Sequence, residues 1–391
     1  MRLSLRGWIS LVGGVVWTVV AVAAGQADLV PVGLFLVVLP LLSVIAMIPS
    51  RLRLRAVRWL PEEPVPTGSP LAWHVGVEAG GFNPAGVGEL TERLDPALGP
   101  NVTVGFGQGM RARRVTAELR TTALWRGRHS VGPARIVLRH ALGFAAVART
   151  TADTGTVVVT PPVSPLGPAR DGRALADGAQ VPLGRAGVTS LDDATIRDYV
   201  DGDDIRRIHW RSTARLGALM VRREDATWDP RARVVLDTRS SAFGAARPDP
   251  RFEAMVGLAA SIAVHLVHAG YAVSLADTHG ALHALDASPL VAHSEALLWL
   301  ADVQTVDNGL TLAPDVGRSG DVVIAILATL SADDALTLTG ATRGGLAVLM
   351  GAEPPDETVA EAFADAGWRL VPVDADTPPA VAWQALTGGR P

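Results

Sequence analysis

Two long uncharged stretches open the chain. Residues 8–25 and 29–49 contain no charged side chain, and only a short polar segment at 26–28 separates them. At 1.5 Å per residue, a helix over either stretch reaches about 27–31 Å, which matches the hydrocarbon core of a bilayer. A pair of buried core helices is disfavoured, because globular helices seldom run so long without a charged face. The pattern therefore predicts a two-helix transmembrane hairpin over residues 1–50.

Arginine is concentrated at the two ends of this hairpin. Arg2 and Arg6 precede the first stretch, and the second is followed by Arg51, Arg53, Arg55 and Arg58. Because basic residues favour the cytoplasmic side, we expect a two-pass plasma-membrane protein with the bulk of the chain in the cytoplasm. An alternative is a signal peptide cleaved near residues 21–23. The second stretch and its arginine-rich exit would then still hold the bulk of the chain inside the cell.

Short alternating runs follow, separated by glycine, proline and asparagine. The runs at 71–77, 114–119, 134–138 and 156–159 show the alternation of half-buried strands. They predict one small β-sandwich or barrel over residues 57–163. Residues 164–189 are rich in glycine and proline with little periodicity, and we interpret them as a linker.

The last part of the chain, residues 231–391, alternates between strand-like and helix-like patterns. Strands are predicted at 233–237, 271–276, 321–327, 346–350 and 368–373, and helices at 252–269, 293–300, 332–338, 357–366 and 379–386. Such alternation predicts an α/β doubly wound fold, with a mostly parallel sheet and helices on both faces.

The composition removes several classes of function. The 35 basic and 39 acidic residues nearly balance, whereas a nucleic-acid-binding protein normally has a basic excess, so we expect no nucleic-acid partner. The chain has no cysteine, which excludes a thiol nucleophile, an iron–sulfur cluster and cysteine-ligated zinc. Every basic residue is arginine, which excludes a P-loop lysine and a lysine Schiff base.

Residues 190–225 contain a dense charged motif between the linker and the α/β region. Its core runs R-D-Y-V-D-G-D-D-I-R-R-I-H-W-R-S-T-A-R, and Gly217 follows. A capped amphipathic helix, with Ile205 and Ile208 on its apolar stripe and Gly217 at its end, accounts for part of the pattern. Exposed ion pairs are worth only about 0–1 kcal/mol each, so the remaining charges suggest either a structural lattice or a recognition surface. The candidate residues are Arg197, Tyr199, Gly202, Asp203, Asp204, Arg206, Ile208, Trp210, Ala214 and Arg215.

This motif resembles the hallmark of the bacterial "domain of unknown function 58" family. The order of domains is also similar: a paired membrane span, a β-rich region, the motif, and then an α/β domain. The resemblance implies a membrane-anchored protein without assigned catalysis, whose C-terminal domain resembles von Willebrand factor type A. It further implies a MoxR-type AAA+ ATPase as the protein partner.

Type A domains that bind a divalent cation place D-x-S-x-S after their first strand. Here the corresponding residues are Asp237-Thr238-Arg239-Ser240-Ser241. Asp237 and Ser241 match the pattern, but Arg239 cannot ligate a cation and its charge would oppose one. We therefore expect no cofactor, with Mg²⁺ at a degenerate site as the alternative. Arg239 is expected either to pair with Asp237 or to bind an acidic side chain of a partner.

Two histidine pairs are weaker candidates for zinc. His265 and His268 are three residues apart, and His279 and His283 four apart, but neither pair has the H-E-x-x-H glutamate.

We therefore predict a non-catalytic, membrane-tethered scaffold that acts with a cytoplasmic ATPase in envelope or complex assembly. The alternative is a cation-dependent ligand-binding domain or a hydrolase that uses Asp237 and Ser241.

Overall fold

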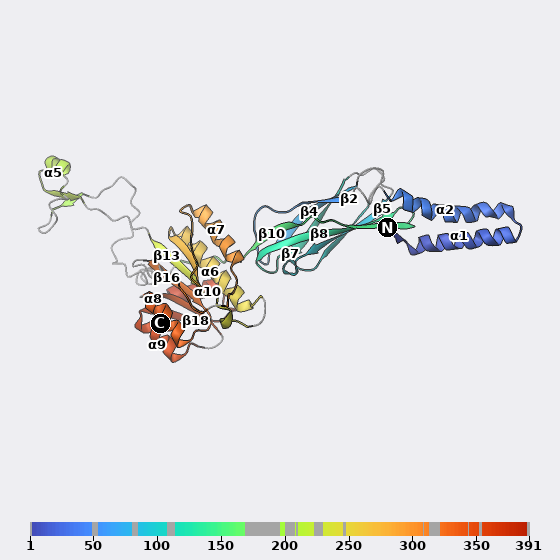
Figure 1. Ribbon diagram of the computed structural model, residues 1–391. Helices are drawn as coiled ribbons and strands as arrows, with labels where there is room; N and C mark the ends of the chain where they lie inside the picture. The colour runs from blue at the N-terminus through green and yellow to red at the C-terminus, as the bar shows by residue number, and fades with distance from the viewer. Residues whose placement is uncertain are drawn as a thin grey trace. The chain divides into compact units, whose positions relative to one another are not determined.

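The computed structural model divides the chain into two compact units, which are described separately (Figure 1). The N-terminal unit comprises Met1–Val163 with Leu297–Val303, and the C-terminal unit comprises Ser164–Ala296 with Gln304–Pro391. The structure describes residues 2–48, 54–79, 85–107, 114–168, 196–199, 208, 210–222, 230–244, 248–307, 309–312, 321–342, 344–351 and 354–388.

Two apolar helices begin the N-terminal unit, as predicted. Helix α1 spans Leu5–Ala23 and helix α2 spans Val30–Ala46, with the short helix η1 (Ala27–Leu29) between them. Helix α1, and the continuous helical segment Ala27–Ala46 formed by η1 and α2, are long and apolar enough to cross a membrane, and most of their residues are not covered by protein. A third helix of comparable length and composition, α6 (Pro250–His268), is largely buried inside the C-terminal unit. The two N-terminal helices are therefore the ones suited to anchor the chain in a bilayer.

Small residues bring α1 and α2 into close contact. A Cβ atom on Gly14 would lie 2.8 Å from the carbonyl oxygen of Gly33, and one on Gly33 would lie 2.9 Å from that of Gly14. The hydroxyl of Ser10 also donates a hydrogen bond of 2.9 Å to the carbonyl of Leu36 on α2. Close backbone approach through small residues, with hydrogen bonds between helices, is the usual way helices associate in lipid.

Neighbouring glycines offer a matched test of this contact. Gly14→Leu should separate α1 from α2, whereas Gly13→Leu should leave them together, because a Cβ on Gly13 meets no atom within 4 Å. Thermal unfolding of the full chain in detergent, followed by helical circular dichroism, would show a lower midpoint for Gly14→Leu alone. Equal midpoints for the two variants would contradict this packing.

The rest of the N-terminal unit is a β-sandwich. Its larger sheet contains β1 (Arg2–Leu3), β3 (Val65–Pro66), β5 (Ala85–Leu94), β6 (Val102–Gly107), β8 (Gly127–His140), β9 (Ala145–Thr150) and β10 (Gly155–Thr160). The smaller sheet contains β2 (Leu54–Trp59), β4 (Pro70–Ala79) and β7 (Arg114–Thr122). Buried side chains of both sheets, including Trp73 and Ile136, form one core. This confirms the prediction of a β-rich region after the two helices.

The pattern of residues did not predict the strand β1 at the start of the chain. Arg2 and Leu3 pair antiparallel with Ala146 and Ala145 of β9. From the sequence, Arg2 is expected only to be a charged flank of the first helix. Two residues are too few to show an alternating pattern, and their partner strand is remote in the sequence.

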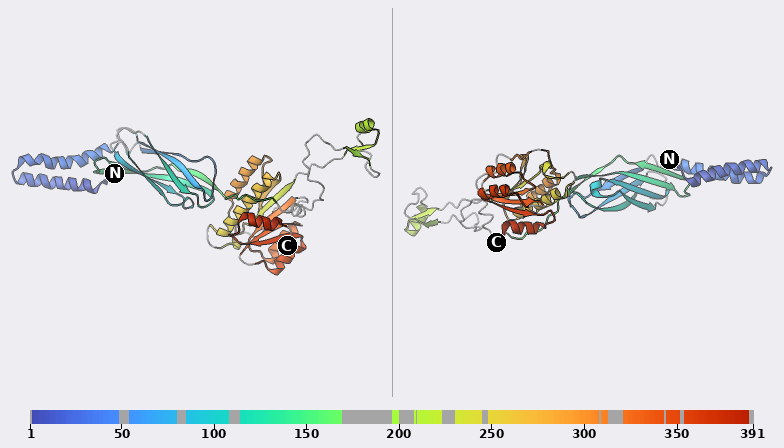
Figure 2. Two further views of the ribbon diagram at one scale, coloured as in Figure 1. Left: turned by 180° about the vertical axis from the view of Figure 1, so that it is seen from behind. Right: turned by 90° about the horizontal axis from the view of Figure 1, so that it is seen from below.

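The C-terminal unit contains the predicted α/β fold (Figure 2). Its strands are β13 (Arg231–Leu236), β14 (Ala272–Asp277), β15 (Leu282–Ala284), β16 (Asp321–Leu327), β17 (Gly345–Met350) and β18 (Trp368–Val373). They lie in the order β15-β14-β13-β16-β17-β18, and only β15 is antiparallel to its neighbour. The helices, besides α6, are α8 (Ala332–Ala341), α9 (Glu357–Asp365), α10 (Pro379–Thr387) and the first part of α7 (Pro289–Asp302), whose residues from Leu297 onward belong to the N-terminal unit.

The chain leaves β13 toward β14 on one side and later returns to β16 on the other. The carboxyl end of β13 is therefore the topological switch point, where open α/β sheets bind ligands. The first residues of the predicted linker lie against this unit. The backbone N–H of Ser164 donates to Ser261 on α6, and Trp383 on α10 donates to the carbonyl of Gly167.

Candidate functional site

Two loops meet at the switch point of the sheet. Leu236, the last residue of β13, pairs in register with Ile326 of the parallel neighbour β16. The residues that follow each strand, 237–244 and 328–331, therefore lie at the same edge. This edge contains the Asp237-Thr238-Arg239-Ser240-Ser241 segment singled out in the sequence.

Asp237 and Arg239 form a bidentate ion pair. The Arg239 Nε atom lies 2.9 Å from Asp237 Oδ1, and Nη2 lies 2.7 Å from Oδ2. Asp237 is completely buried and Arg239 is almost so. The carboxylate also accepts hydrogen bonds from the backbone N–H of Arg239 and Ala328 and from the hydroxyl of Thr278. Protein donors thus occupy both oxygens, as the predicted pairing of Asp237 with Arg239 requires.

Arg239 also connects β13 to the helix that follows β16. Its Nη1 atom lies 2.6 Å from Asp334 Oδ2, and Nη2 donates to the carbonyl of Thr329 at 3.1 Å. Asp334 belongs to a capping box with Ser331 at the start of α8, which confirms the predicted helix start. The sequence did not predict the contact between Arg239 and Asp334, because the two residues are 95 positions apart in the chain.

The charges at this edge stabilise one another. Burial opposes the charge on Arg239, but hydrogen bonds and charge from Asp237 and Asp334 outweigh it and raise the pKa of the guanidinium. Burial works against ionised Asp334 in the same way. Hydrogen bonds from Ser331 and the charge of Arg239 nevertheless lower the pKa of this carboxyl. Arg239 and Asp334 are therefore both charged at neutral pH, and the guanidinium lies between the carboxyl groups of Asp237 and Asp334.

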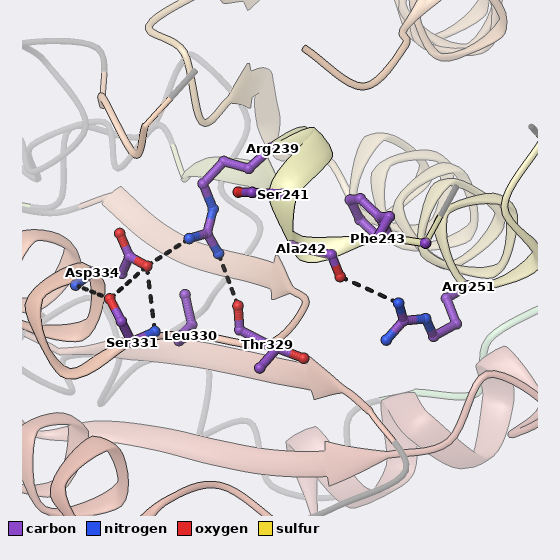
Figure 3. A pocket seen from close by; sticks show the side chains of 10 residues that line it. Arg239, Ser241, Ala242, Phe243, Arg251, Thr329, Leu330, Ser331 and Asp334 are labelled. Carbon is purple, nitrogen blue, oxygen red and sulfur yellow. Dashed lines mark hydrogen bonds and ion pairs between the residues drawn. The ribbon is translucent and has the colours of Figure 1, made fainter. Parts of the chain in front are cut away.

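An open pocket of about 610 Å³ lies over this ion-pair cluster (Figure 3). Ser241 and Phe243 line it on the β13 side, and Thr329 and Ser331 on the β16 side. Arg251 at the start of α6 also lines the pocket. Its Nη2 atom donates to the carbonyl of Ala242 at 3.3 Å. Arg251 is a second cation of the pocket that the sequence did not predict, and its position in the first turn of α6, after the Asp249 cap, is the local signal for it.

These residues do not fit a divalent cation. The Arg239 guanidinium lies directly on the Asp237 carboxylate, which would be the first acidic ligand, and a positive group there opposes a bound cation. Within the described part of the chain, no cluster of three or more His, Cys, Asp or Glu side chains could hold a metal ion. The histidine pairs have other contacts: the His268 ring lies 5.5 Å from the His293 ring, and His279 lies beside Asp277.

The motif segment forms a small substructure of its own. Strand β11 (Ile196–Asp198) pairs with β12 (Met220–Arg222), so that Arg197 lies opposite Val221. The backbone N–H of Tyr199 donates to the carbonyl of Leu219 at 2.8 Å. Helix α5 (Trp210–Leu216) lies between the strands and ends at Gly217, which has a φ of +70° as a C-terminal glycine should.

The motif helix is shorter than the sequence suggested. It begins at Trp210, so the buried Ile208 precedes it and does not belong to its apolar stripe. Trp210 is 66% exposed, and Ala214 and Arg215 are also exposed. The predicted site residues Gly202, Asp203, Asp204 and Arg206, as well as Ile205, lie outside the described residues.

Comparison with known proteins confirms the family resemblance. Residues 195–288 match the family described as "Protein of unknown function DUF58". No curated protein matches the chain. Similar solved structures include the CARDB domain of the PF1109 protein from Pyrococcus furiosus, with 15% identity over 27% of this chain and 86% of that chain (TM-score 0.20). Cwp6 from Clostridium difficile has 9% identity over 82% of this chain and 53% of that chain (TM-score 0.20). These similarities are too low to support an argument about function.

Proposed function

We propose that this chain, whose residues 195–288 match the family of proteins of unknown function DUF58, is a non-catalytic, membrane-tethered interaction protein. In this proposal α1 and α2 anchor the chain in the plasma membrane, and the bulk of the chain is cytoplasmic. The C-terminal unit and the motif segment bind the partner. The partner is a MoxR-type AAA+ ATPase, and the complex acts in envelope or complex assembly.

The main observation behind this proposal is that the carboxylate of Asp237 is fully engaged by other groups of the protein. A hydrolase or a cation-dependent binding domain needs an acidic group that is free to act on water, substrate or metal. Both oxygens of Asp237 accept hydrogen bonds from protein groups, and the guanidinium of Arg239 occupies the place where a cation would be bound. The geometry therefore favours recognition over catalysis.

Two further observations support an interaction role. The C-terminal unit has an α/β sheet with an antiparallel edge strand, which is compatible with the von Willebrand factor type A fold that the family resemblance implies. In the motif, Trp210 is a large, mostly exposed aromatic side chain. Exposed tryptophan and arginine are the residue types that most often dominate binding at protein interfaces.

Recovery of the partner from native membranes tests the proposal. The full-length protein should recover a MoxR-type ATPase, and Trp210→Ala should lose it without a change in thermal stability. Leu290→Ala is the matched control, since it removes another exposed apolar side chain, 82% exposed, from the same unit. Equal recovery by Trp210→Ala and the unmodified protein would remove the motif helix from the interface. A clear Mg²⁺-dependent rise in melting temperature would favour the cation-dependent alternative.

Thiol labelling tests the orientation. The chain has no cysteine, so Ala27→Cys and Ser69→Cys each introduce a unique label. In intact cells a membrane-impermeant reagent should modify Ala27→Cys, which lies between the helices, and should not modify Ser69→Cys. Modification of Ser69→Cys would place the β-sandwich outside the cytoplasm.

A further inference from the structure

The turn between β8 and β9, residues 141–144, is fastened to the first turn of α1. The backbone N–H of Ser4 donates to the carbonyl of Phe144 at 2.9 Å, and the hydroxyl of Ser4 donates to the carbonyl of Gly143 at 2.5 Å. Ser4 also caps α1, because its hydroxyl accepts a hydrogen bond from the backbone N–H of Gly7. One residue thus holds both the start of the helix and the turn.

Two further features make this attachment rigid. Gly7 lies so close to the carbonyl of Phe144 that a Cβ atom would not fit. Strand β1 pairs with β9 directly after the turn. Within the turn, the backbone N–H of Gly143 donates to the carbonyl of His140 at 2.7 Å, and that of Leu142 donates to the His140 ring at 3.2 Å. The turn therefore has a fixed position along the axis of α1.

This position corresponds to the surface of the membrane. The 19 residues of α1 rise about 28 Å, which takes up the whole hydrocarbon core. The start of the helix at Leu5 then lies at the boundary between headgroups and acyl chains, and the turn lies at the same level.

The side chains of this region suit such a boundary. Leu142 is 53% exposed in the turn, and Leu5 is exposed at the start of α1. Arg2 and Arg6 are exposed on the same short stretch, and a guanidinium nitrogen of Arg6 lies 3.8 Å from the position of a Cβ on Gly143. Exposed leucines flanked by arginines are typical of elements that lie in the interface of an anionic membrane.

We propose that the β8–β9 turn is a membrane-contacting element, in which Leu142 inserts among the lipids beside the start of α1. The bilayer is thus the partner of this surface, and the contact fixes the β-sandwich against the membrane at a second point. The inference rests on the insertion of α1 and α2 in the bilayer.

Site-specific fluorescence of the protein in nanodiscs tests whether Leu142 contacts the lipids. Leu142→Cys in the full chain would be labelled with an environment-sensitive thiol fluorophore and exposed to lipids that carry a quencher near the headgroup. Leu124→Cys is the matched control, because Leu124 has a similar exposure, 46%, and precedes the end of β8 that is opposite the turn. The 14 residues of β8 extend about 45 Å, so this end of the strand is far from the turn. Val16→Cys, exposed in the middle of α1, reports whether the hairpin is inserted.

We expect lipid quenching at positions 142 and 16 that is several-fold stronger than at 124. Equal quenching at 142 and 124, with strong quenching at 16, would overturn the inference and leave the anchor intact. If the fluorophore at position 142 is protected from iodide, an aqueous quencher, and is not quenched by the lipids, the turn would contact a second copy of the chain. This result would also overturn the inference. Absence of quenching at 16 would overturn both the anchor and the inference. Ala141→Cys, at the neighbouring exposed position, reports on the same turn if Leu142→Cys does not fold.

Discussion

Arg239→Ser should lower the free energy of unfolding of the C-terminal unit by about 3–5 kcal/mol, the usual effect of removing one partner from a buried ion pair. The guanidinium is 7% exposed and contacts two carboxylates, Asp237 and Asp334. Its loss leaves the completely buried Asp237 charge without a counter-ion. Hydrogen exchange of β13 and β16 in the full-length protein measures the effect, because these central strands open only when the unit unfolds.

Arg251→Ser is the control for Arg239→Ser. Arg251 lines the same pocket, but its side chain is 37% exposed and lies 3.9 Å from its nearest carboxylate, Asp249. Its loss should therefore have a much smaller effect on exchange. Equal protection in Arg239→Ser and Arg251→Ser would mean that the Asp237–Arg239 pair does not stabilise the sheet.

The same variant tests the degenerate cation site. Arg239→Ser restores the D-x-S-x-S order and leaves Asp237 with a free charge, so we expect it to gain Mg²⁺ or Mn²⁺ affinity that the unmodified protein lacks. Calorimetric titration of both proteins measures this. Tight binding of either ion by the unmodified protein would contradict the assignment of Arg239 as a permanent substitute for the cation.

The sequence predicted the C-terminal fold well because its strands are buried apolar runs of ordinary length. Residues 321–327 and 368–373 were predicted as strands, and β16 and β18 have those bounds. Strand β15 escaped prediction, since it has only three residues and no fully buried side chain. In the motif, Gly217 marked the helix end correctly, whereas no local signal showed that the helix starts as late as Trp210.

The candidate site was predictable only where its contacts are local. Asp237 and Arg239 are two residues apart, so their pairing was open to inference from the sequence. Asp334 is 95 residues from Arg239 and reaches it only because β16 lies beside β13. Thr278 reaches Asp237 through the adjacent strand β14. Contacts of this kind depend on strand order, which the alternation of elements does not specify.

Arg58→Ala should destabilise the β-sandwich by about 3–5 kcal/mol as well, for a related reason. Arg58 on β2 and Glu92 on β5 belong to different sheets, and their ion pair of 2.6 Å joins the sheets inside the core. Glu92 is completely buried, and its second oxygen, Oε2, has no hydrogen-bond partner among the described residues. Removing Arg58 would leave this carboxylate without its counter-ion.

The effect of Arg58→Ala should depend on pH in a defined direction. Burial raises the pKa of Glu92 above its ordinary value of 4.5, and Arg58 partly counteracts this. Because the native state binds the proton more tightly than the unfolded state, the stability linked to Glu92 is complete below pH 4.5 and falls as the pH rises through the native pKa. Without Arg58 that pKa rises further. The difference between Arg58→Ala and the unmodified protein should therefore be small near pH 4 and large near pH 7.

Two controls separate charge from packing in this experiment. Arg120→Ala removes a guanidinium that pairs with Glu118 on the exposed face of β7, and it should change stability little at any pH. The double variant Arg58→Met/Glu92→Leu removes both buried charges and should recover most of the stability that Arg58→Ala loses, because apolar pairs of similar volume replace buried ion pairs at little cost. Hydrogen exchange of β2 and β5 would follow all of these variants. A loss in Arg58→Ala that is equal at both pH values, and that the double variant does not reverse, would show that Arg58 stabilises the core by packing alone.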